Sequence, residues 1–239
     1  MTNNIVTRPF AGKSQRIREQ HEDFWNRETA LVDVDAYFNR TPGHQYANTA
    51  KWIKETTPFT QWKRARFAES QNALLIGNRS SFDVVQYPDS PGTAGMSMIH
   101  IMAISKGNLF NGVSLDRNSV SIIDEMVDLF KTSWADPTVR QAILQHQRKA
   151  IELQAGNNHD QTYREAIEHY RELEAMINDL NEDDFTFGLH LWPDNSVGHL
   201  HMHIIATPPE CRRYSTFLHD DKTKDAIEVR DYIRTRSLI

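Results

Sequence analysis

Apolar and polar positions alternate along two neighbouring segments in the last third of the chain. Residues 185–191 and 197–206 alternate with a period of two, as strands do, and turn-forming residues 193–195 lie between them. This pattern predicts an antiparallel hairpin. Shorter apolar runs that end at Gly, Asn or Pro predict three earlier strands. The expected strands are 73–76, 82–85, 96–104, 185–191 and 197–206.

Helical spacing of apolar residues appears between the third and fourth expected strands. It covers 116–134, 138–153 and 163–180, and Pro137 stands where the start of a helix accepts proline. The sequence therefore predicts an α+β fold, with an antiparallel sheet of about five strands and helices packed on it.

The two ends of the chain differ from this central region in their pattern of apolar and charged residues. Residues 1–70 carry scattered aromatic residues among charges, which predicts a helical N-terminal extension packed on the core. The core domain is expected to span 71–210, with a helical insertion near 137–160. Residues 211–239 are expected to form a C-terminal tail that is helical from about Lys222.

Composition narrows the class of protein. Hydrophobic residues make up 39% and charged residues 25%, which is the balance of a soluble globular protein and not of a disordered one. A net charge of −5 gives no general attraction to nucleic acid, so nucleic-acid binding is not expected. We find no apolar run long enough for a membrane helix and no signal-peptide core, and expect a cytoplasmic protein that does not bind membranes. The single cysteine, Cys211, excludes an internal disulfide and a cysteine-rich zinc module.

The strongest candidate for chemistry is a row of three histidines in the last expected strand. His199, His201 and His203 are separated by single apolar residues, so a strand would turn all three imidazoles to one face. Metal binding and nucleophilic catalysis both remain open from the residues alone. Alternate strand positions lie about 6.5 to 7 Å apart, so three imidazoles converge poorly on one ion, although two could, with His100 or His190 as third ligand. A nucleophile flanked by two histidines suits the spacing better.

The segment 196–205 resembles the His-x-His-x-His-x-x signature of histidine-triad proteins, in which x is apolar. Upstream, 188–193 resembles the strand and turn before the triad in the aprataxin and scavenger-decapping branches. The strand 99–106 resembles an earlier strand of the family that holds a buried histidine. Taken together, the resemblance covers roughly 73–207.

This resemblance implies phosphorus chemistry at His201. In the family, the middle histidine attacks phosphorus and forms a covalent phosphohistidine intermediate, which water then hydrolyses. His199 and His203 would flank the nucleophile, and His100 matches a histidine that hydrogen-bonds within the site. Neither a metal nor a cofactor is expected for this scheme.

The resemblance also implies residues that hold the substrate. The phosphate-binding candidates are Ser196, Asn195 and His190, and Asp89 is the candidate for a ribose contact. Two positions depart from the family pattern, since Ser105 replaces a proline and Asn108 stands where many members have histidine. Nucleotide specificity therefore does not follow from the resemblance. Aprataxin-like DNA repair is not expected, because its zinc finger needs more than one cysteine.

We therefore expect a hydrolase of a phosphoanhydride, phosphoramidate or nucleotidyl bond, with a small phosphate-bearing or nucleotide-like substrate. A homodimer is compatible with the sequence. Two alternatives remain open. In one, the histidines provide acid and base or metal chemistry on a non-nucleotide metabolite. In the other, the protein is a nucleotide-binding module without catalysis.

Overall fold

The computed structural model describes residues 9–47, 66–78, 81–87, 89, 92–157 and 161–236. Their fold is α+β and contains a six-stranded antiparallel sheet with the strand order β1-β2-β3-β5-β4-β6. The strands are β1 (Arg66–Glu69), β2 (Ala73–Gly77), β3 (His100–Ser105), β4 (Phe185–His190), β5 (His201–Ala206) and β6 (Thr223–Asp225). Strands β2, β3, β4 and β5 lie where the sequence predicts strands, whereas β1 and β6 come from the regions expected as helical ends.

The expected strand at 82–85 is wrong. Val84–Gln86 forms a short 3-10 helix, η1, instead. The carboxylate of Asp83 accepts a hydrogen bond from the backbone N–H of Val85 at 3.0 Å, so this side chain caps a turn. An aspartate that binds the backbone two residues further on competes with strand pairing, and here the local bond prevails.

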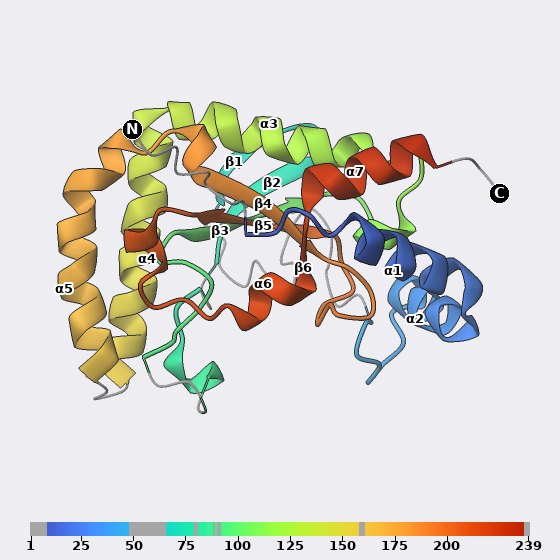
Figure 1. Cartoon of the computed structure of the whole chain (residues 1–239), viewed down its shortest axis with the longest axis horizontal. Coiled ribbons are helices and arrows are strands. Elements are labelled where there is room, and N and C mark those ends of the chain that lie inside the picture. Colours follow the sequence, from blue (N-terminus) through green and yellow to red (C-terminus); the bar gives the residue numbers. More distant parts are fainter. Residues whose placement is uncertain are drawn as a thin grey trace.

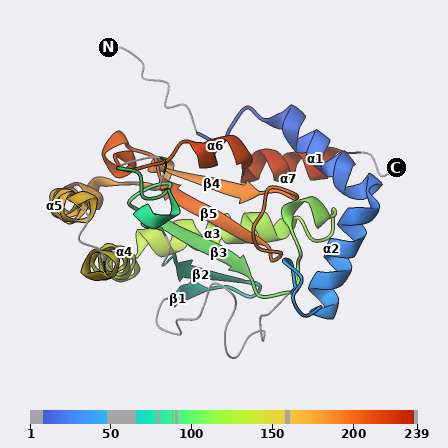
Figure 2. The same ribbon diagram turned by 90° about the horizontal axis from the view of Figure 1, so that it is seen from below.

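The three helices predicted between the third and fourth strands are confirmed. Figure 1 shows α3 and α7 over one face of the sheet, α4 beside α5 at one end of the molecule, and α1 with α2 at the opposite end. Figure 2 shows the same arrangement from below. The helices are α1 (Ser14–Asn26), α2 (Glu28–Asn39), α3 (Ser121–Ala135), α4 (Pro137–Asn157), α5 (Gln161–Met176), α6 (Leu218–Lys222) and α7 (Ala226–Thr235).

The two faces of the sheet bury different side chains. One face packs against α3 and belongs to the main core, which includes Leu75, Ala103 and Ile204. On the other face, Ile104 lies opposite His201 and Met102 lies opposite His203. Strand alternation thus sends apolar residues of β5 into the core and two histidines to the opposite face.

The segment expected as a C-terminal tail is part of the sheet. α6 ends at Lys222, and the next three residues form β6, which pairs with β4 at the edge of the sheet. α7 begins only at Ala226, where the carboxylate of Asp225 caps it by accepting bonds from the N–H groups of Ile227 and Glu228. The helical start expected near Lys222 is therefore wrong by about one turn.

The N-terminal segment packs against this same edge of the sheet. Asp225 donates its N–H to the carbonyl of Phe10 at 3.2 Å, and the N–H groups of Gly12 and Lys13 donate to the carboxylate of Glu228. α1 also contacts α7. Within the described ranges, none of the helices combines the length and apolar character that crossing a membrane requires.

Gly188 of β4 tests this packing, because the Phe10 ring lies directly over it. A Cβ atom there would lie 2.4 Å from Cγ2 of Thr223 and 2.7 Å from the Phe10 ring. Gly188→Ala should therefore lower the free energy of unfolding by about 1–3 kcal/mol, as measured by urea denaturation. Gly107→Ala is the control, since its Cβ would meet only Oγ of Ser105 at 3.6 Å. Equal stability of the two variants would contradict the packing described here.

Candidate functional site

Five imidazoles line one cavity on the histidine face of the sheet. The cavity has a volume of about 270 Å³. Three strands and α6 contribute these rings, which belong to His100, His190, His201, His203 and His219. Other side chains in the wall include Asn78, Tyr87, Ser196 and Lys222.

His203 is at the centre of this cluster. Its ring centroid lies 4.3 Å from that of His190, 5.0 Å from that of His201 and 5.1 Å from that of His100. The register explains this, because His203 lies opposite Gly188 on β4 and opposite Met102 on β3. The pairing of three strands therefore gathers histidines that are about 90 residues apart along the chain.

The hydrogen bonds of His201 fix the position of its proton. Its Nδ1 lies 2.7 Å from the carbonyl oxygen of His199. A carbonyl oxygen only accepts, so Nδ1 carries the hydrogen, and Nε2 of the neutral ring carries the lone pair. Nucleophilic attack by an imidazole needs such an unprotonated nitrogen.

A second chain of hydrogen bonds sets the proton on His203. Nδ2 of Asn78 lies 3.3 Å from Nδ1 and 3.4 Å from Nε2 of His100, and Nε2 of His100 lies 2.9 Å from Nδ1 of His203. Because the shorter bond to His203 occupies Nε2, we assign the Asn78 bond to Nδ1, so that Nε2 of His100 carries the hydrogen and donates it to His203. His203 therefore carries its own hydrogen on Nε2. This atom is buried and has no hydrogen-bond partner in the described part of the chain. A buried donor without an acceptor is costly, and a ligand oxygen would satisfy it.

His199 does not line the cavity. β5 begins at His201, so His199 precedes the strand and lies outside its alternation. Nε2 of His199 donates to the carbonyl of Ser105 at 3.0 Å, and Nδ1 accepts from the hydroxyl of Tyr37 at 2.6 Å. The prediction that all three imidazoles share one surface is thus wrong, because only His201 and His203 do so. The ring of His199 instead holds the backbone whose carbonyl orients His201.

Two of the expected phosphate-binding residues line the cavity. Ser196 is exposed and lies in its wall. His190 lines the wall as well, and its Nε2 lies 2.9 Å from the hydroxyl oxygen of Thr223. That hydroxyl donates to the carbonyl of His219, so it accepts a hydrogen bond from His190.

The structure does not bring the other two expected contact residues to the cavity wall. The amide of Asn195 donates to the carbonyl of Val197 at 3.0 Å and shapes the turn before the histidines. Asp89 is exposed in a turn and does not line the cavity. Its expected contact with a ribose has no counterpart in this cavity.

Three residues are among those of the wall that sequence reasoning missed. Tyr87, His219 and Lys222 all line the cavity, and the hydroxyl of Tyr87 lies 3.1 Å from Nε2 of His219. His219 and Lys222 stand in a short polar stretch with no periodic signal. Only the pairing of β6 with β4 carries that stretch to the histidines, and the sequence gives no sign of this long-range contact.

Burial keeps the imidazoles neutral. It lowers the pKa of His100 to about 3, with smaller contributions from His219 and His201. Burial also lowers the pKa of His190 and of His203 well below the usual 6.5, and lowers that of His201 despite its hydrogen bond to a carbonyl. At neutral pH these rings are thus uncharged hydrogen-bond donors and potential nucleophiles.

The α6 side of the cavity carries the positive charge. Burial, together with a smaller contribution from the charge of Lys222, lowers the pKa of His219 to about 4. The pKa of Lys222 is lowered by burial and raised by the more distant Asp194. Among the described residues of the wall, only Lys222 is charged at neutral pH, so the cavity suits an anion.

The described residues contain no group of three or more His, Cys, Asp or Glu side chains placed to hold a metal ion. Comparisons of the chain with protein-family models, with curated proteins and with solved structures found no match.

The neutral buried histidines make the stability depend on pH. The pKa of His21, His100 and His199 is about 3 in the folded protein, against about 6.5 when exposed. Below pH 6.5 the unfolded chain binds protons that the folded chain does not, so stability falls as the pH drops from 6.5 toward 3. We expect a loss on the order of 1 kcal/mol per pH unit for each such histidine, measured by urea unfolding at pH 7, 6 and 5.

A variant outside the cavity checks the cause of this loss. His21→Leu removes one of the protonating groups, so its stability should depend less steeply on pH than that of the wild type. Equal stability of the wild type at pH 7 and pH 5 would contradict the conclusion that these buried histidines are neutral in the folded protein.

Proposed function

We propose that this protein is a hydrolase of the histidine-triad type that cleaves a phosphoanhydride, phosphoramidate or nucleotidyl bond through a covalent intermediate on Nε2 of His201. The observation that best supports this is the 2.7 Å hydrogen bond from Nδ1 of His201 to the carbonyl of His199. This bond holds the ring in the tautomer that a nucleophile requires. The arrangement of the signature residues supports the same family in the absence of any matching relative.

In the first step, the Nε2 lone pair of His201 attacks phosphorus. A nitrogen–phosphorus bond forms, and the bond from phosphorus to the leaving group breaks. The ring becomes positively charged, and the Nδ1 hydrogen bond to the His199 carbonyl stabilises that charge. The buried N–H of His203 donates a hydrogen bond to the leaving-group atom, which departs with the electrons of the broken bond and takes any proton that it needs from water.

In the second step, water hydrolyses the phosphohistidine. The oxygen of a water molecule attacks phosphorus and loses a proton to solvent, while the N–H of His203 keeps its hydrogen and can donate a hydrogen bond to that oxygen. The nitrogen–phosphorus bond then breaks, and its electrons return to Nε2 of His201. Both histidines end in their starting protonation states, so the cycle is closed without a further reactant.

The environment suits this chemistry because it maintains neutral rings. A protonated His201 has no lone pair to attack with, and burial disfavours protonation. Tyr37 and Ser105 hold the ring of His199, which keeps the carbonyl acceptor in place. His199 thus has a positioning role in this proposal and does not contact the substrate.

Substitution of the nucleophile tests the proposal. His201→Ala should lower kcat by several orders of magnitude on a phosphoramidate or dinucleoside polyphosphate substrate, because it removes the atom that forms the covalent bond. Intact-mass measurement after a rapid quench at neutral or alkaline pH should find a phosphorus adduct on wild type and none on the variant. His44→Ala is the control, because this imidazole lies 3.5 Å from the carboxylate of Asp33 and does not line the cavity.

Retention of more than about a tenth of the wild-type activity by His201→Ala, a loss of only ~1.4 kcal/mol, would contradict the covalent role. Tight phosphate binding without turnover would favour the binding module over the enzyme.

A further inference from the structure

The C-terminal segment supplies one wall of the histidine cavity. α6 carries His219 and Lys222 into this wall, and the strand β6 that follows it pairs with β4. This segment lies beyond the region that resembles the histidine-triad signature. Its contribution to the site therefore follows from the fold of this chain and not from the resemblance.

The ammonium group of Lys222 is partly buried. Within the described part of the chain, its ammonium group forms no hydrogen bond and no ion pair. Asp194 acts on it only from beyond ion-pair distance. The charge of Lys222 also acts on His190 and His219, which line the same cavity. Because a desolvated ammonium is costly without a partner, an anion in the cavity would be stabilised there.

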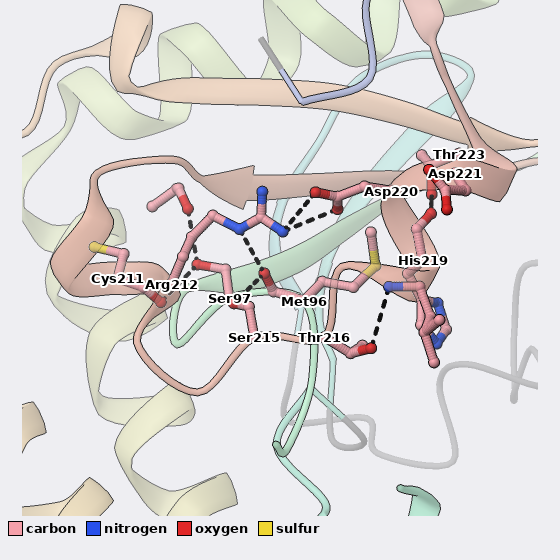
Figure 3. Close-up of polar contacts among 12 residues, drawn as sticks. Met96, Ser97, Cys211, Arg212, Ser215, Thr216, His219, Asp220, Asp221 and Thr223 are labelled. Carbon is pink, nitrogen blue, oxygen red and sulfur yellow. Dashed lines mark hydrogen bonds and ion pairs between the residues drawn. The ribbon is translucent and has the colours of Figure 1, made fainter. Parts of the chain in front are cut away.

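An ion pair ties α6 to another part of the cavity wall. Both terminal oxygens of Asp220 accept hydrogen bonds from Arg212 at 2.9 Å, and Nε of Arg212 donates to the carbonyl of Met96 at 3.2 Å. Met96 itself lines the cavity. Figure 3 shows Arg212 reaching from its own segment to both Met96 and Asp220. Both bonds to Asp220 come from Nη2 of Arg212, and the two side chains are largely buried, so this ion pair is well shielded from solvent.

The N-terminal segment of the chain fixes the C-terminal end of α6. The ammonium of Lys13 donates to the backbone carbonyls of Asp220, Asp221 and Thr223. These are carbonyls at the end of the helix, where positive charge is favourable. α6 is thus held at its middle residue, Asp220, and at its C-terminal end, so that the backbone that carries Lys222 has a defined position.

We propose that Lys222 is a substrate-binding residue whose ammonium group binds a non-bridging oxygen of the substrate's phosphoryl group, and that Arg212 and Asp220 position it. This proposal rests on the phosphorus chemistry proposed above for His201. The neutral imidazoles provide the nucleophile and the N–H donor, and Lys222 provides the positive charge that an anionic phosphate needs. The ligand class is a phosphate-bearing anion.

Calorimetry with inorganic phosphate at pH 7 tests the role of Lys222. Lys222→Met should weaken phosphate binding at least tenfold, because it removes the charge while keeping most of the side-chain volume. Lys222→Arg should stay within about threefold of wild type. The control is Lys131→Met on α3, which removes an equal charge that faces Glu182 at 3.6 Å, outside the cavity. Acetate at the same ionic strength should bind more weakly than phosphate.

Several outcomes would overturn the assignment. They are wild-type affinity in Lys222→Met, an equal loss in Lys131→Met, binding of acetate as tight as phosphate, and no phosphate binding by wild type. Lys222→Gln is a second uncharged variant, to be used if the methionine variant fails to fold.

Steady-state kinetics separate this proposal from the covalent mechanism. If the His201 adduct forms and Lys222→Met leaves KM unchanged, the role of Lys222 is wrong and the mechanism stands. If phosphate binding depends on Lys222 but no adduct forms, the anion site stands and the covalent mechanism is wrong.

A double-mutant cycle tests the positioning pair. Asp220→Asn should weaken phosphate binding at least threefold in the wild-type background and have no further effect in Lys222→Met, because the pair acts through Lys222. Arg212→Lys keeps the charge but cannot bond Asp220 and the Met96 carbonyl through two separate nitrogens, and it is the second variant if Asp220→Asn does not fold. Additive effects, or no effect of Asp220→Asn alone, would overturn the positioning role.

Discussion

The pairing of β5 with both β3 and β4 is the constraint on which the site depends. β5 lies between these strands, so each residue on its histidine face has neighbours on two sides. His203 consequently contacts His100 on one strand and His190 on the other. A one-residue shift in this register would turn the histidines of β5 toward α3 and the apolar residues toward the cavity. The apolar core on the opposite face therefore stabilises the register that assembles the site.

Burial follows from this packing and determines the protonation of the cluster. Several imidazoles in one cavity would repel one another if they were charged, and desolvation already opposes protonation. Neutral rings must then satisfy their donors and acceptors locally, and the hydrogen bonds of His100, His199 and His201 do so in a fixed direction. Those bonds determine that Nε2 of His201 has a lone pair and that Nε2 of His203 carries a hydrogen.

The sequence predicted the parts of the fold in which the local pattern and the tertiary contacts agree. Strands β4 and β5 alternate clearly, and α3 has a single apolar face, so their positions were predictable. The failures have local or long-range causes. At 82–85 the capping bond of Asp83 prevails over strand propensity. At 223–225 a polar stretch without a strand signal becomes β6 because β4 offers it a free edge.

For the site, the sequence by itself determined that His201 and His203 share a face, because strand geometry fixes alternation regardless of what surrounds the strand. Only the tertiary structure decided that His199 lies outside the cavity, since the starting point of β5 depends on its partner strand. Tertiary structure likewise brought His219 and Lys222 into the wall and set which nitrogen of His201 carries the proton. These features arise from contacts between distant segments, and a local pattern of residues does not encode such contacts.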